Sequence, residues 1–260
     1  ASKDVTGGIA VEEAAVQSVG GRLAFTDDIV FSSSNLINRH LSGWPRETRE
    51  FLDGFTVRPP ASSIIDWLKK AHKLKVLVVG ETIIDEYEYC ESIGKSSKEP
   101  TLAVKKLHDK KFAGGILAVA NHVSDFVEQT HLLTMLGDTD SHEVFIRQNL
   151  KPSVDPDFVI RTASPTIVKK RIIEHYFFTK MLEIYSINDT GLAPGDNKAF
   201  CGRLDRVIDD YDLVIVADFG HSMISKDAVK ILSERSKYLA LNVQANAGNM
   251  GYNVVSKYPR

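Results

Sequence analysis

Apolar and polar residues alternate along this chain in an order that is typical of α/β proteins. Unbroken apolar runs, which indicate buried strands, occur at 76–79 and again at 213–217. Between them, apolar residues recur every three to four positions over 114–128 and 141–150, which predicts two helices with one buried face each. Because strands and helices take turns, the pattern predicts a doubly wound, mostly parallel sheet flanked by helices.

The same periodicities extend the pattern toward both ends of the chain. Helices are predicted at 7–21, from 32 to 41, at 63–74 and at 225–236, and strands at 22–26, 130–136, 157–162 and 238–243. The first 41 residues therefore look like the tail of a βα unit, which is too small to form a domain alone.

Two further segments alternate polar and apolar residues, as half-exposed strands do. One covers 87–112 and the other covers 166–187, where charges interrupt two β-rich runs. Their pattern differs from the fully apolar runs of the main sheet. They are therefore predicted to form a small sheet apart from it, as a lid.

Prolines and glycines concentrate at 42–62, around one short helical piece, which is typical of a linker. The sequence is therefore divided into 1–41, the linker 42–62, and a larger domain at 63–260 that includes the lid.

Composition and charge narrow the classes of partner. The chain has 260 residues, 43% of them apolar, so it can bury a core, and its formal net charge of −2 offers no basic field for nucleic acid or anionic membrane. The longest apolar runs are far shorter than a membrane helix requires. Cys90 and Cys201 lack C-x-x-C spacing, which favours a reducing cytoplasm. A cytoplasmic protein that binds neither nucleic acid nor membrane is expected.

Candidate ligand-binding residues follow the apolar runs, because ligands of open α/β sheets bind beyond the carboxyl ends of strands. Asp85 and Asp218 lie at such positions. Asp85 could accept hydrogen bonds from two sugar hydroxyls, or it could be a surface turn residue. Gly114 and Gly115 precede the predicted helix, where they either let a ligand approach the backbone or form a plain turn.

Three other groups of residues are further candidates. Asn121, a candidate ligand-binding residue, lies off the apolar stripe of the helix at 114–128. Strand alternation sends Lys169 and Arg171 to one face, where they could hold a phosphate or be solvated. Three hydroxyl residues at a predicted helix start could cap that helix or cradle a phosphate. These hydroxyl residues are Ser32, Ser33 and Ser34. Metal-ligand spacing of histidines, the P-loop pattern and the G-x-S-x-G pattern do not occur in the sequence.

Several ordered segments carry a resemblance to a known family. They read "VLVVGETIIDEYEY", "KSSKEPTLAVKKL", "FAGGILAVANHV", "PTIVKKRII" and "DLVIVADFGHSMIS". In this order they resemble the ribokinase/PfkB carbohydrate kinases, and within them the heptose-phosphate kinases of ADP-heptose synthesis. The resemblance implies a ribokinase-like fold and ATP-dependent phosphorylation of a sugar hydroxyl with Mg²⁺.

The resemblance also implies roles for particular residues. Asp85, in the loop after the first strand, and the glycine pair would bind a phosphorylated sugar. Lys169 and Arg171 would lie in the lid, and Asp218 would end a strand beside the site. The lid strands would pack against a second copy in a homodimer.

The first 41 residues resemble the end of a cytidylyltransferase-like nucleotidyltransferase, with Ser32, Ser33 and Ser34 in its nucleotide-binding loop. The resemblance places that family's His-x-Gly-His motif before residue 1 and the kinase's Gly-Ala-Gly-Asp motif after residue 260. The chain is therefore expected to be an internal piece of a bifunctional enzyme that, as given, catalyses neither reaction.

Four positions depart from the kinase pattern, and two of them are Asn242 and Gln244, which stand where the family tends to have aspartate and lysine. Ala118 stands where the motif has an asparagine, and Glu81 replaces the usual aspartate after the first strand's glycine. Ala118 supports an alternative hypothesis, a non-catalytic sugar-sensing or dimerisation module with the kinase fold.

Overall fold

The computed structural model of this chain describes residues 9–22, 44–55, 61–188, 190–244 and 254–258. The chain divides into two compact units, Ala1–Ala61 and Ser62–Arg260. Each unit is described by itself.

The first unit contains two described helices. Helix α1 (Ile9–Ser18) lies within the helix predicted at 7–21, and α3 (Arg46–Phe55) is the short helical piece of the linker. Residues 23–43 lie outside the described residues, and the predicted helix at 32–41 lies with them. The same holds for the hydroxyl residues Ser32, Ser33 and Ser34.

The second unit is built on the predicted parallel sheet, which is confirmed. Its strands are β1 (Lys75–Gly80), β4 (Gln129–Thr139), β5 (Val154–Pro165), β8 (Leu213–Asp218) and β9 (Leu239–Val243). Their order is β5-β4-β1-β8-β9, and every neighbouring pair is parallel. Strand β1 is therefore central, in agreement with its continuous apolar run.

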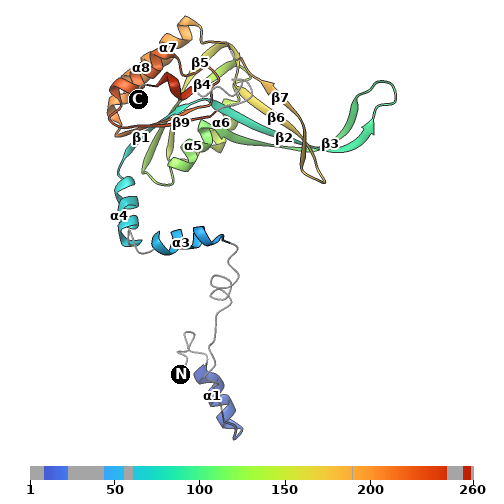
Figure 1. Cartoon of the computed structure of the whole chain (residues 1–260), viewed down its shortest axis with the longest axis vertical. Coiled ribbons are helices and arrows are strands. Elements are labelled where there is room, and N and C mark those ends of the chain that lie inside the picture. The colour runs from blue at the N-terminus through green and yellow to red at the C-terminus, as the bar shows by residue number, and fades with distance from the viewer. Residues whose placement is uncertain (1–8, 23–43, 56–60, 189, 245–253, 259–260) are drawn as a thin grey trace. The chain divides into compact units, whose positions relative to one another are not determined.

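Helices cover both faces of this sheet (Figure 1). The covering helices are α5 (Ile116–Val123), α6 (Glu143–Asn149), α7 (Pro194–Val207) and α8 (Lys226–Arg235). Val76 and Val78 pack in the core shared with α5 and α6, while Leu77 and Val79 pack in the core shared with α7 and α8. All four side chains are fully buried, because successive side chains of a strand point to opposite faces.

Three further elements complete the described part of the second unit. They are helix α4 (Ala61–Ala71), which precedes β1, and the 3₁₀ turns η1 (Ile208–Asp210) and η2 (Val254–Lys257). Within the described residues, every helix is too short or too polar to cross a membrane. Cys90 and Cys201 are both free thiols.

The predicted lid is also a separate sheet, as expected, but it begins earlier in the chain. Its strands are β2 (Thr82–Lys95), β3 (Leu102–Gly115), β6 (Ile167–Glu174) and β7 (Thr179–Ser186), in the order β3-β2-β6-β7. Strand β2 starts directly after β1 and pairs with β3 as far as Gly115. The expectation that Asp85 lies in a loop is therefore wrong, because Asp85 lies within β2 and is paired on both sides.

Candidate functional site

The C-terminal ends of the two central strands meet at one edge of the main sheet. Gly80 at the end of β1 is in register with Ala217 near the end of β8. The next residues along each strand are Glu81 and Asp218, and both are almost fully buried. Buried carboxylates are costly unless they are hydrogen-bonded, so their partners define the local structure.

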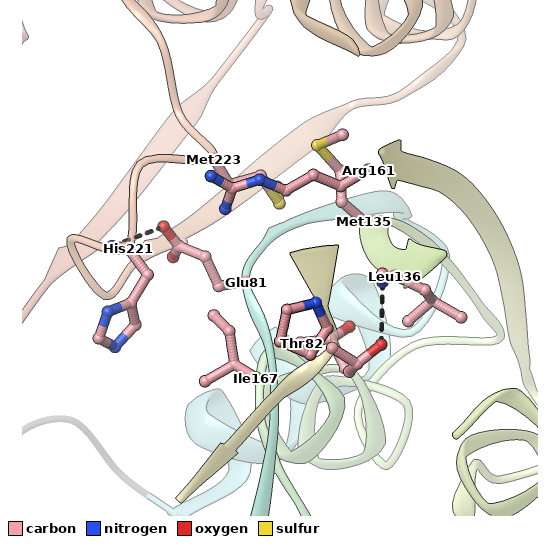
Figure 2. A pocket seen from close by; sticks show the side chains of 11 residues that line it. Glu81, Thr82, Met135, Leu136, Arg161, Ile167, His221 and Met223 are labelled. Atoms are coloured by element: carbon pink, nitrogen blue, oxygen red, sulfur yellow. Dashed lines mark hydrogen bonds between the residues drawn. The ribbon is translucent and has the colours of Figure 1, made fainter. Parts of the chain in front are cut away.

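Glu81 joins three parts of the fold. The backbone N–H of Phe219 donates to its Oε2 over 2.8 Å, and that of His221 donates to its Oε1 over 3.1 Å. Figure 2 shows Glu81 reaching toward the segment that carries His221. Its own carbonyl oxygen accepts from the N–H of Ile116, the first residue of α5, over 3.0 Å.

Burial raises the pKa of Glu81 to about 7, and the negative charge of Asp218 adds to the rise. The N–H groups of Phe219 and His221 act in the opposite direction because they stabilise the carboxylate. The net result is a buried carboxyl group that titrates near neutral pH.

Asp218 has its own set of partners. Its Oδ1 accepts from the N–H of Gly220 over 2.9 Å, and its Oδ2 accepts from the hydroxyl of Tyr258 over 3.3 Å. The ammonium group of Lys257 lies 3.6 Å from the same Oδ2. Burial, followed by the charge of Asp218, raises the pKa of Tyr258. Asp218 is therefore a buried, paired carboxylate at the strand end.

Asp85 lies on the lid and forms an ion pair. Its Oδ1 is 2.5 Å from Nη1 of Arg171, whose Nε is 3.4 Å from Glu183 and whose guanidinium lies 5.3 Å from the ring centre of Tyr87. The Asp85 side chain keeps 25% of its surface exposed, so a ligand can still reach it.

The two glycines are required by close packing at this place. A Cβ atom on Gly114 would lie 2.1 Å from Oδ2 of Asp85, and one on Gly115 would lie 2.6 Å from the carbonyl oxygen of Glu81. Gly115 also has a φ of +54°, which disfavours other residues. The pair ends β3 and begins α5, so it is not an isolated turn. The structure thus brings Asp85 and the glycine pair together.

Lys169 and Arg171 share one face of β6, as strand alternation predicted. They lie two residues apart on β6, where their partners on β2 are Asp85 and Tyr87. The Lys169 ammonium lies 5.6 Å from the ring centre of Tyr185. Burial lowers the pKa of Lys169, and the nearby carboxylate of Asp85 partly opposes this effect.

Asn121 has a different environment from the other candidates. Its Nδ2 donates to the carbonyl of Asn149 over 2.8 Å, and its Oδ1 accepts from the N–H of Lys151 over 2.9 Å. The amide therefore ties α5 to the loop before β5. Since both ends of the amide are in use, Asn121 is left out of the proposed site.

A hollow with about 320 Å³ of empty space, part of it open to solvent, lies at the same edge of the main sheet (Figure 2). The centre of a water molecule can occupy only about 20 Å³ of it, which is room for about one water. Its polar lining comes from Glu81, Thr82, Arg161, Thr166 and His221. Sequence reasoning missed Arg161, since it resembles an ordinary strand residue, and it assigned no role to Thr82 or Thr166. His221 lies three residues after Asp218, which the strand-end argument had indicated.

Comparison with known proteins gives relatives of moderate similarity. A Campylobacter jejuni protein is 25% identical over 184 residues, which make up 71% of this chain and 38% of that protein. A Haemophilus influenzae protein is 25% identical over 158 residues, or 61% of this chain and 32% of that protein. Both are named bifunctional protein HldE. This chain spans about 38% of the length of the first HldE relative.

No family model matches the chain. Among solved structures, a carbohydrate kinase from Agrobacterium tumefaciens has a TM-score of 0.45 and 17% identity, covering 65% of this chain and 53% of that one. Arabidopsis thaliana ribokinase complexed with ribose and ATP has a TM-score of 0.43 and 14% identity, with 65% and 53% covered. Similarity at this level carries no argument about the site.

The arrangement of these side chains defines what the site can do. The partly exposed carboxylate of Asp85 can accept hydrogen bonds from a ligand, and the cations Lys169 and Arg171 can attract an anion. Among the described residues, no three histidine, cysteine, aspartate or glutamate side chains are grouped so that they could hold a metal ion. The described site is therefore suited to holding a polar, anionic organic ligand.

Proposed function

We propose that this chain is the sugar-binding portion of an ATP-dependent carbohydrate kinase that acts on a heptose-phosphate-like sugar. The parent protein would be a bifunctional kinase and nucleotidyltransferase of nucleotide-sugar biosynthesis, in the cytoplasm. The similarity to HldE proteins supports this proposal. The observation that carries it is the contact between Asp85 and Gly114 beside Arg171, which leaves an acceptor and a cation next to the start of α5.

A phosphorylated sugar would use both kinds of group. Its hydroxyls would donate to the carboxylate of Asp85, which the Arg171 pair holds in one orientation. Its phosphate would be attracted by Lys169 and Arg171, which share a face of the lid. The glycine pair would let the sugar approach the first turn of α5.

ATP and Mg²⁺ would be required for the kinase reaction of the parent enzyme. ATP would supply the phosphoryl group, and catalysis of this kind depends on positioning and charge stabilisation. The part proposed for this chain is to bind and orient the sugar.

Titration calorimetry of the chain with a panel of heptose phosphates and hexose phosphates tests the proposal. Saturable binding with one site per chain is expected for at least one of them. Asp85→Ala should abolish it, whereas Asp109→Ala, which removes a lid carboxylate paired with Lys106, should leave it unchanged. Absence of binding across the panel by a folded chain would refute the proposal.

We also propose that the lid strands mediate a homodimer. Apolar side chains on these strands remain exposed, which leaves the sheet with uncovered apolar surface. They include Leu102, Leu107, Phe112, Leu182 and Ile184. Light scattering should give twice the mass of the chain, and a monomer at all concentrations would contradict this part.

The alternative function, a non-catalytic sugar-sensing or dimerisation module, is favoured by Ala118. This residue is exposed on α5 and carries a methyl group where the kinase motif has a hydrogen-bonding amide. The full-length parent decides between them. Sugar-dependent ADP release from ATP and Mg²⁺ supports the kinase, while sugar binding without ADP release supports the module.

A further inference from the structure

The proposed function makes no use of Glu81, although it is the carboxylate with the most main-chain contacts at the site. It stands between β1 and β2 and contacts two other segments, the loop after β8 and the start of α5. Through Gly115, which packs against its carbonyl oxygen, it also touches the glycine pair. One buried residue thus contacts the main-chain segments that surround the site.

The loop after β8 presents two N–H groups that need an acceptor. Phe219 and His221 point their N–H groups at different oxygens of Glu81. The intervening Gly220 has a φ of 77° and the following Ser222 a φ of 71°, so this loop adopts a conformation that extended or helical pairing cannot satisfy. A side chain has to supply the acceptors.

A carboxylate meets this need better than a glutamine of the same shape. Both oxygens of a carboxylate accept hydrogen bonds, whereas glutamine offers one oxygen and an NH₂ group that would face a second N–H donor. A buried N–H group that loses its acceptor costs the desolvation free energy of that group. The identity of the acceptor atoms therefore matters more here than the volume of the side chain.

We propose that Glu81 is a positioning residue of the sugar site, which holds the loop 219–221 and the first turn of α5 at fixed places without touching the sugar. This inference rests on the proposed function only for its sugar-affinity readout. Asp218 precedes the loop and Gly115 precedes the helix, so both parts of the proposed site are anchored to the same residue.

Two substitutions separate an acceptor role from a packing role. Glu81→Gln keeps the size of the side chain and removes one acceptor, while Glu81→Asp keeps both acceptor oxygens and removes one methylene. If Glu81 positions the loop through its oxygens, Glu81→Asp resembles the original chain more closely than Glu81→Gln. A packing role gives the opposite order.

The experiment uses the whole chain and measures amide hydrogen exchange in the peptide that covers residues 216–224, together with calorimetric affinity for the panel of sugar phosphates. At pH 8, above the pKa of about 7 of Glu81, exchange in Glu81→Gln should rise roughly ten- to hundredfold at whichever of Phe219 and His221 faces the new NH₂ group, as expected for losing a hydrogen bond to a charged group. Sugar affinity should fall by a similar factor, and Glu81→Asp should recover most of both. The control is Glu86→Gln, which removes a buried lid carboxylate paired with Lys170. It should change neither the amide exchange in the peptide 216–224 nor the affinity for sugar phosphates.

Unchanged exchange at the two amides in Glu81→Gln, or faster exchange in Glu81→Asp than in Glu81→Gln, would overturn the inference. If Glu81→Gln does not fold, Glu81→Asp decides alone, because loss of protection there also overturns it and retained protection supports it. A chain that binds no sugar on the panel refutes the proposed function, while the exchange data still test the role of Glu81.

Discussion

The titration of Glu81 should appear in the pH dependence of stability. The change to make is Glu81→Gln, which removes the titrating proton and keeps the side-chain shape. The pKa of Glu81 rises from an ordinary 4.5 to about 7 on folding, chiefly by burial. The folded chain therefore binds this proton more tightly than the unfolded chain does.

The sign and size follow from this difference. Stabilisation by the proton is fully present below pH 4.5 and is lost as the pH rises toward about 7. A pKa difference of about 2.5, at about 1.4 kcal/mol for each unit, corresponds to about 3 kcal/mol of unfolding free energy. The other ionisable groups near Glu81 are present in both proteins, so only the part of their titration that depends on the charge of Glu81 enters the comparison. They are Asp218, His221, Lys257, Tyr258 and Lys169.

The assay is urea unfolding followed by far-ultraviolet circular dichroism at a series of pH values from 4.5 to 8. The unfolding free energy of the original chain, minus that of Glu81→Gln, should fall by about 3 kcal/mol across this series. A difference that stays constant or grows with pH would show that Glu81 does not carry the buried proton.

Three substitutions at backbone positions give further tests. Gly114→Ala should abolish sugar-phosphate binding and lower the free energy of unfolding in urea by roughly 1–3 kcal/mol, because the added Cβ would displace the Asp85 carboxylate. The control is Gly191→Ala, where a Cβ meets open space, and it should leave binding intact. Ala163→Gly should raise the unfolding free energy by roughly 0.5–1 kcal/mol, since the exposed Ala163 has a φ of 47°, and a loss of stability would contradict this reasoning. Gly202→Ala, inside α7 with space for a methyl group, should also stabilise the chain by roughly 0.5–1 kcal/mol, seen as a higher urea midpoint.

Sequence patterns predicted the main sheet because its strands are buried on both faces. The runs at 76–79 and 213–217 have few other readings, so β1 and β8 were located correctly. Helix α7 was not predicted. Its segment contains Gly195 and Gly202, and its fully buried apolar side chains are only Phe200 and Leu204, which leaves a weak helical period.

The sequence indicated individual candidate residues for the site but not the contacts between them. Asp85 and Gly114 are far apart in sequence, and their contact depends on the register of β2 and β3, which shifts at two irregularities. The burial of Glu81 could not be predicted either, because a polar residue after a strand's last glycine usually faces solvent. Its side chain accepts hydrogen bonds from a distant loop, since Phe219 lies 138 residues later in the chain.

The way in which β1 and β5 continue into the lid limits how the two sheets can move. One residue, Glu81, separates β1 from β2, and one residue, Thr166, separates β5 from β6. Both are buried, and the hydroxyl of Thr166 accepts from the N–H of Gly137 and donates to the carbonyl of Ser141. Strand β3 also passes directly into α5 at Gly115, so the lid joins the main layer at a third short connection. Three such connections leave less freedom than a single hinge axis would, so the base of the lid is held in place beside the hollow that Glu81 and Thr166 line.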